Sequence, residues 1–351
     1  MDAARARVLA LVRRFGWNAT AFQTLEPGYR YYFPSEDACV AYVDTGRAWV
    51  AAGAPIAAAE ALAPSVRSFI EAADAAGRRA CFFAVEERLL LAANASSEAI
   101  APAGGFTPPI TGPDAALSAV QIGEQPVWGP AAWTETLRKH KSLREQLRRA
   151  RAKGVVVRQL HPAELGPGPT RAAIEALCLR WQRSRALAPL DFLVRLELFE
   201  HAEERQSFVA ERGEQVLGFA GLVPVPARHG WFLEDLIRDP TAPSGTSELL
   251  VDAAMRAAAR SGAPWFTLGL APLSGAVPAP LRVARSTGGM LYDFRGLRAF
   301  KAKLRPSAWT PIYLGFPREQ GPLRSLLDGL AAFTGGGFLR FGLRSLARLA
   351  D

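Results

Sequence analysis

The hydrophobic positions of this chain follow helical spacing in some segments and extended spacing in others. Residues 3–15 carry apolar side chains at helical intervals and are followed by Gly16, which predicts an N-terminal helix. The runs ACVAYVDTG and AWVAAGAPI predict two strands around a turn at 44–46. A second helix is expected from about Ala59 to Ala76, and RACFFAVEERLL is expected to form another strand. This alternation predicts an α/β fold with a mixed sheet flanked by helices.

A similar order recurs in the second half of the chain. After the short strand VVVRQL and a helix at 171–186, QSFVAERGEQVLGFAGLVPVP predicts a hairpin that turns at Arg212 and Gly213. WFLEDLIRDP then predicts a strand, ELLVDAAMRAAARSG a helix, and PWFTLGLAPLSG a further strand with its turn. Hairpin, strand, loop, helix and strand is the order of the acetyltransferase-like (GNAT) fold. Two such domains in tandem, joined by a basic helix, are therefore expected.

Composition shifts divide the chain into four regions. The segment 101–130 is rich in Gly and Pro and is expected to close the first domain. The predicted division is an N-terminal GNAT-like domain at 1–130, a basic linker helix at 131–154, a C-terminal GNAT-like catalytic domain at 155–320 and an amphipathic basic tail at 321–351.

The overall composition narrows the functional classes. Hydrophobic residues make up 49% and charged residues 21% of the 351 residues, as in an ordinary globular protein. Three widely separated cysteines and four histidines give no zinc-like spacing, which argues against a metalloenzyme and fits a reducing cytoplasm. No window of about 20 charge-free apolar residues occurs, so a soluble protein, or one bound peripherally to the inner face of the membrane, is expected.

Positive charge is concentrated in two zones. The net charge is +9, yet residues 138–153 alone carry +7 and residues 278–351 carry +8, so the rest of the chain is acidic. The first zone is typical of a helix that contacts the phosphate backbone of RNA, although a solvated connecting helix is the alternative. The candidate contacts to a phosphate backbone, which would be that of tRNA if the resemblance described below holds, are Arg138, Lys141, Arg144, Arg148 and Arg151.

The C-terminal tail carries a second candidate interaction surface. Leu339, Leu343 and Leu346 alternate with arginines spaced four residues apart. This pattern fits an amphipathic helix lying on anionic lipid, or equally a helix whose leucines dock on the second domain.

The loop before the helix ELLVDAAMRAAARSG bears on the cofactor. In CoA-dependent acetyltransferases this loop is glycine-rich, and its backbone N–H groups hold the pyrophosphate at the helix N-terminus. Here RDPTAPSGTSE has one glycine, Gly245, and two prolines that cannot donate. A CoA site is therefore disfavoured, and no cofactor is expected.

Six segments in order resemble the C-terminal catalytic domain of phosphatidylglycerol lysyltransferases, also called multiple peptide resistance factors. They are GWNATAFQTLEPGYRYYF, AYVDTGRAWVAAGAPI, KSLREQLRRARAKGV, EDLIRDPTAPSGTSELL, TLGLAPLSG and LYDFRGLRAFKAKLRPSAWTPIYL. The resemblance implies a tandem GNAT fold that moves an aminoacyl group from charged tRNA to the glycerol hydroxyl of phosphatidylglycerol, without CoA or metal. Many members also carry a large multi-helix membrane domain, which is not found in this sequence.

The resemblance also implies site residues. Asp235 and Arg238 match the family's Asp-x-x-Arg, and either Lys301 or Lys303 matches its active-site lysine; Lys301 is favoured because it would pair with Asp235. If FKAKLRP is extended, both lysines point to one side. A spacing of three on a strand puts Asp235 and Arg238 on opposite faces, so they can act together only if the strand ends near Ile237. The alternative is that the two residues have only a structural role, as a salt bridge at the end of the strand.

Further residues are assigned to substrate binding. Lys303, Arg305 and Arg285 are candidates for phosphate, and Glu234 is a candidate for the ammonium group of the amino acid, although a surface acid is the alternative.

Three other functions compete with transfer to phosphatidylglycerol. The tRNA donor could serve a sterol, peptide or small-metabolite acceptor, the chain could be a CoA-dependent N-acyltransferase, or it could be a non-catalytic module that binds tRNA or membrane.

Overall fold

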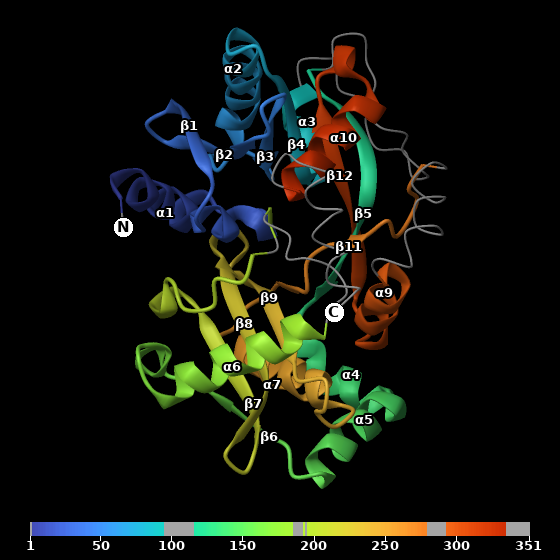
Figure 1. Ribbon diagram of the computed structural model, residues 1–351. Coiled ribbons are helices and arrows are strands. Elements are labelled where there is room, and N and C mark those ends of the chain that lie inside the picture. The colour runs from blue at the N-terminus through green and yellow to red at the C-terminus, as the bar shows by residue number, and fades with distance from the viewer. Residues whose placement is uncertain (1, 95–115, 185–191, 194, 279–292, 335–351) are drawn as a thin grey trace.

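One continuous mixed sheet runs through the molecule, with helices on both faces (Figure 1). The structure is a computed structural model that describes residues 2–94, 116–184, 192–193, 195–278 and 293–334. The strands lie in the order β1-β2-β3-β4-β12-β5-β10-β9-β8-β7-β6, and β11 pairs with β5. Their bounds are β1 Arg30–Ser35, β2 Ala38–Asp44, β3 Ala48–Ala52, β4 Arg79–Val85, β5 Ser118–Trp128, β6 Val156–Gln159, β7 Gln206–Arg212, β8 Gln215–Val225, β9 Gly230–Arg238, β10 Phe266–Thr267, β11 Ala271–Pro272 and β12 Ala308–Phe316.

The helices have apolar faces that cover this sheet. In α1, the N-cap Asp2 accepts from two backbone N–H groups, and the residues facing inward include Val8, Leu11 and Val12. The helices are α1 Ala3–Phe15, α2 Leu62–Ala75, α3 Glu87–Asn94, α4 Trp133–Lys139, α5 Lys141–Ala152, α6 Pro169–Arg183, α7 Thr246–Arg260, α9 Phe294–Lys303 and α10 Pro322–Phe333. None of the helices in these described ranges is long and apolar enough to cross a membrane.

The two halves of the sheet repeat one topology. In the first half, β2 is antiparallel to β3, and β3 runs through α2 into the parallel strand β4. In the second half, β8 is antiparallel to β9, and β9 runs through α7 into the parallel strand β10. The predicted α/β class and tandem acetyltransferase-like arrangement are thereby confirmed.

The strands β5 and β12 join the halves. Residues 118–128 were expected to belong to a Gly- and Pro-rich segment closing a domain, but they form the long central strand β5 (Figure 1). Gly123 and Pro126 are tolerated because β12 pairs along nearly the whole of β5 and fixes its register. β12 comes from residues 308–316 and lies between β4 and β5, so the C-terminal part of the chain completes the first half of the sheet.

Three local predictions were wrong. Residues 87–90 begin the helix α3 rather than extending the strand β4. The basic helix is broken at His140, whose extended backbone separates α4 from α5. FKAKLRP is not extended, because Lys301 and Lys303 lie in the last turn of α9. The amphipathic helix predicted around Arg340, Arg344 and Arg348 lies outside the described residues.

Candidate active site

A β-bulge places two acids in the centre of the second half. On β9, Asp235 is opposite Gly221 of β8, and Leu233 is opposite Leu222, so Glu234 is an extra residue in the strand. The bulge turns both carboxylates into the interior, where the Glu234 and Asp235 side chains are 4% and 5% exposed. Glu234 is therefore a buried acid rather than a surface one.

Asp235 and Arg238 do not act from one face. Beyond the bulge the β8–β9 register is regular up to Arg238, so β9 does not end near Ile237 as the joint action of the two residues required. Because Asp235 and Arg238 are three positions apart on a regular strand, the two side chains point to opposite faces. Arg238 donates to the carbonyl of Ala242, 3.4 Å away, at the start of the loop to α7.

Arg205 is the cation that meets the two acids. It lies just before β7, and its Nη1 is 2.5 Å from Glu234 Oε2 and 3.7 Å from Asp235 Oδ2. Its Nε donates to the backbone carbonyl of Glu200, and its guanidinium lies over the ring of Phe22. The contacts fix a charge that is almost completely removed from water.

A third carboxylate reaches this cluster from the first half of the chain. Glu26 follows the 3-10 helix Ala19–Leu25 and is 5% exposed. Burial and the charges of Glu234 and Asp235 raise the pKa of Glu26 to about 9. Burial and the charge of Glu234 also raise the pKa of Asp235 well above its ordinary value, against the opposing effect of Arg205.

Three buried carboxyls, those of Glu26, Glu234 and Asp235, form an acidic cluster that shares one cation, Arg205. One oxygen of each carboxyl is buried and has no hydrogen-bond partner among the described residues: Glu26 Oε1, Glu234 Oε1 and Asp235 Oδ2. Buried acceptors without donors are costly, so this cluster suits a ligand that brings N–H or O–H groups and positive charge. A substrate ammonium group has both properties.

Lys301 is buried at a different place. Its Nζ donates to the carbonyls of Leu268 at 2.7 Å, Gly269 at 2.9 Å and Leu270 at 2.8 Å. The expected pair of Asp235 and Lys301 is therefore absent, since three N–H donors serve three backbone acceptors. Burial lowers the pKa of Lys301 to about 7, while the three carbonyls favour its protonated form.

The Lys301 contacts hold the turn of TLGLAPLSG in place. Gly269 has φ of 67°, and a Cβ there would lie 2.6 Å from the ring of Phe232, so this position requires glycine. Lys301 thus fastens the turn after β10 to α9, beside the strand β9 that carries the acids.

The remaining residues predicted to contact the substrate lie at different places in the structure. Lys303 pairs with Glu248 in the first turn of α7 at 2.5 Å. Arg305 lines a cavity between α9 and α4. Arg285 lies outside the described residues.

Most of the candidate tRNA contacts have partners within the protein. Arg138 pairs with Glu135, Arg148 with Glu145, and Arg151 with the buried Asp252 of α7. Arg144 donates to the backbone carbonyl of Leu137 at the end of α4. No side-chain partner of Lys141 is found among the described residues.

α5 also covers the helix end where an acetyltransferase would hold a pyrophosphate. A Cβ on Gly245, which precedes α7, would lie 2.3 Å from the carbonyl oxygen of Gln146 in α5. Thr246 and Glu248 in the first turn are buried, and Glu248 brings negative charge to this end. The packing therefore disfavours phosphate binding by the α7 N-terminus.

Sequence reasoning missed two residues of this site, the cation Arg205 and the acid Glu26. Arg205 follows a run of acids that includes Glu197 and Glu200, and an arginine ending such a run is a weak signal for a buried ion pair. Glu26 lies in GWNATAFQTLEPGYRYYF, a segment that the resemblance covered without assigning a role to its acid.

The topology and the acidic cluster define an acyltransferase of the tandem acetyltransferase-like class. Within this class, the family described as phosphatidylglycerol lysyltransferase, C-terminal, matches residues 9–316, so the chain belongs to that family. It is a transferase domain of the lysylphosphatidylglycerol synthetase type. No curated protein sequence matches the chain.

Solved structures support the fold. A C-terminal domain from Agrobacterium fabrum, assigned to a lysylphosphatidylglycerol synthetase, is 23% identical with a TM-score of 0.76, over 95% of this chain and 98% of that one. L-PGS from Bacillus licheniformis is 18% identical with a TM-score of 0.75, and the match covers 95% of this chain and 97% of that one. FemX is more distant, at 13% identity and a TM-score of 0.55, and the match covers 93% of this chain and 99% of that one. At these identities the similarity concerns the fold.

Proposed function

We propose that this enzyme transfers an aminoacyl group from charged tRNA to the hydroxyl of phosphatidylglycerol or a related lipid. The observation that carries the proposal is the acidic cluster of Glu26, Glu234 and Asp235, whose buried oxygens without a hydrogen bond from the described residues suit an ammonium group. An aminoacyl ester carries such a group next to its reacting carbonyl. The family to which the chain belongs supports the same chemistry.

Asp235 is the proposed catalytic carboxylate. Its raised pKa makes it a better proton acceptor than an ordinary aspartate, as a general base acting on a hydroxyl requires. The lipid oxygen attacks the aminoacyl carbonyl, its proton passes to Asp235 directly or through water, and the tRNA ribose oxygen leaves and takes up a proton. Glu234 and Glu26 hold the ammonium group.

Positioning and charge stabilisation supply most of the rate. Exchange of one ester for another is close to thermoneutral, and well-oriented reactants can gain roughly 7 to 11 kcal/mol. A donor at the tetrahedral oxyanion adds about 3 to 4 kcal/mol. Lys301 contributes by holding the turn at 268–270, and Arg238 remains a candidate for phosphate on the opposite face of β9.

The rest of the chain has proposed supporting roles. The chemistry belongs to 155–320, and the basic segment 131–154 faces the tRNA, with Lys141, Arg148 and Arg149 among its exposed side chains. Lipid as acceptor implies contact with an anionic membrane surface, to which the tail at 321–351 contributes. A peptide, sterol or soluble acceptor is the alternative that the same donor chemistry permits.

The largest expected effect is on transfer itself. Asp235→Asn keeps the shape of the side chain but removes its basicity, so transfer from charged tRNA should fall by about 10²- to 10⁴-fold. The matched control is Asp37→Asn, at an exposed carboxylate that pairs with Arg14. Transfer is measured with purified protein, charged tRNA and phosphatidylglycerol vesicles, with mass spectrometry of the extracted lipids. Full activity of Asp235→Asn would refute the catalytic role, and an aminoacylated soluble product without aminoacylated lipid would favour the alternative acceptor.

A further inference from the structure

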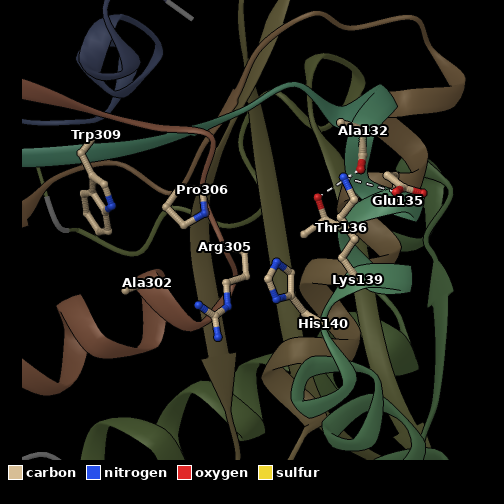
Figure 2. Close-up of a pocket in the computed structure, with 9 residues that line it drawn as sticks. All are labelled: Ala132, Glu135, Thr136, Lys139, His140, Ala302, Arg305, Pro306 and Trp309. Carbon is tan, nitrogen blue, oxygen red and sulfur yellow. Dashed lines mark hydrogen bonds and ion pairs between the residues drawn. The ribbon is translucent and has the colours of Figure 1, made fainter.

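A cavity of about 460 Å³ lies between α4 and the segment that joins α9 to β12 (Figure 2). Lys139 and His140 line it from the end of α4, and Arg305 and Trp309 line it from the other side. Figure 2 shows the Arg305 side chain between the indole of Trp309 and the imidazole of His140. The cavity thus combines basic side chains with a large aromatic ring.

The positive charge in this cavity is not fully used within the protein. Arg305 makes no side-chain hydrogen bond or ion pair with any described residue. The one acid in the lining, Glu135, is shared by Arg138 at 2.7 Å and Lys139 at 3.4 Å, so two cations face one carboxylate. An anionic group would complete the coordination of Arg305 and Lys139.

The backbone at Arg305 indicates that its side chain matters. Arg305 directly follows Leu304, the C-cap of α9, and has φ of 57°. Helices that end in the left-handed region usually have glycine there, because other residues are strained. An arginine occupies a position where the backbone conformation favours glycine.

Trp309 offers a surface for an aromatic ring. It is half-buried at the start of β12, and the guanidinium of Arg298 lies 4.8 Å from its ring centre. Arg298 also pairs with Glu124 at 3.7 Å, which holds the stacked arginine in place. A nucleobase can stack on an indole braced in this way.

We propose that this cavity binds one nucleotide at the end of an RNA strand, with the base on Trp309 and the phosphate between Arg305 and Lys139. The proposal rests on the proposed function, which supplies tRNA as the donor. The basic helix α5 begins at Lys141, directly after the cavity residue His140, so its exposed basic side chains follow the cavity in the chain.

A lipid head group fits this cavity less well. None of the large exposed apolar residues in the described part of the chain lines it. A run of such residues instead lies on α10, where Leu323, Leu327 and Leu330 are 70%, 51% and 53% exposed. α10 packs on β3, β4 and β12 in the first half, away from α4 (Figure 1).

The test measures the affinity of the full chain for a labelled single-stranded RNA ending in CCA, by fluorescence anisotropy. Trp309→Leu keeps an apolar side chain but removes the stack, and should weaken binding by about 5- to 150-fold. Arg305→Gly should also weaken binding and should lower the slope of log affinity against log salt by about 0.7, as for one lost phosphate contact. The control Arg47→Gly removes the same charge from an exposed hairpin in the first half and should leave affinity unchanged.

Stability separates a lost contact from a misfolded variant. Arg305→Gly relieves the left-handed backbone, so its urea midpoint should equal or exceed that of the parent protein. The proposal would be overturned if Trp309→Leu and Arg305→Gly bound the RNA as tightly as the control Arg47→Gly and the parent protein do. So would a loss of vesicle binding by Trp309→Leu with RNA affinity intact, since the cavity would then take lipid. AMP alone competing as well as the RNA would support the nucleotide site and identify a free nucleotide as its ligand.

The RNA-binding test can be interpreted independently of the catalytic role proposed for Asp235. If Asp235→Asn keeps full transfer activity while RNA binding depends on Trp309 and Arg305, the catalytic assignment fails and the nucleotide site stands. If Asp235→Asn is inactive while RNA binding ignores both residues, the reverse holds.

Discussion

The strands β3 and β9 occupy the same place in the two halves of the molecule but differ in what they carry. Both pair antiparallel with the preceding strand and run through a helix into a parallel neighbour. β3 is AWVAA, it pairs with β2 in regular register, and Val50 and Ala51 are fully buried. β9 has one extra residue, Glu234, and places two carboxylates inside.

The comparison shows how one topology serves two purposes. An all-apolar strand contributes packing energy to the first half. Burying the carboxyls of the bulged strand lowers the stability of the fold, and Arg205 compensates for this loss only in part. The first half still contributes Glu26, so the acidic cluster is complete only when the halves are joined.

Removing the buried cation should have the largest effect on stability. Arg205→Met leaves Glu234 and Asp235 without their partner and should cost about 3 to 5 kcal/mol of unfolding free energy at pH 7. The matched variant in the first half is Arg79→Met, which breaks the pair with Asp328. Because the Arg79 side chain is 38% exposed and water can replace it, its loss should cost about 1 to 3 kcal/mol.

Urea unfolding of both variants measures this contrast. The deficit of Arg205→Met should shrink at low pH, where the acidic cluster takes up protons. Equal costs for the two variants at pH 7 would mean that Arg205 is no more important for its buried acids than Arg79 is for Asp328.

The turn held by Lys301 gives a prediction of intermediate size. Gly269→Ala places a Cβ 2.6 Å from Phe232 at a φ of 67°, and should cost about 2 to 3 kcal/mol through combined strain and crowding. In the first half, Gly46 has φ of 82° with open space around it, so Gly46→Ala should cost only about 1 kcal/mol. Thermal unfolding of the pair separates crowding from backbone strain, and a Gly269→Ala cost no larger than that of Gly46→Ala would contradict the tight packing of the turn.

The smallest predicted effect is a pH dependence set by Glu26. Its pKa is raised from 4.5 to about 9 in the folded protein, so between these values the folded state binds more protons than the unfolded state. This contribution to stability is complete below pH 4.5 and is lost as the pH rises through about 9. Glu26→Gln should remove that loss and be more stable than the parent at pH 9 by at least about 1.4 kcal/mol, the value of one pKa unit.

Unfolding free energies of the two proteins from pH 5 to pH 9 test this dependence. Parallel pH profiles for Glu26→Gln and the parent would show that Glu26 is ionised in the folded protein. A cationic ligand at the cluster should also lower the apparent pKa, because it stabilises the carboxylate.

Sequence patterns predicted the helices and strands better than they predicted which strands pair and which side chains meet. The hairpins, α1, α2 and α7 followed from local periodicity and turn residues, and β9 was found from WFLEDLIRDP. The strand β5 was missed, because Gly123 and Pro126 weaken a local strand signal that β12, nearly 200 residues later, restores by pairing. The helical state of Lys301 was also missed, since FKAKLRP has no strong helical pattern of its own, and the N-cap Asp293 starts the helix eight residues earlier.

The candidate site divides in the same way. By itself, the sequence determined the α/β class, the repeated strand and helix order and the family, because these depend on local periodicity and on matched segments. Only the tertiary structure decided that Asp235 meets Arg205 and Glu26, that Lys301 binds carbonyls, and that Arg305 and Trp309 share a cavity. The reason is that a single inserted residue in β9 and a distant strand in the sheet set the direction and partners of these side chains, and neither leaves a periodic signal in the chain.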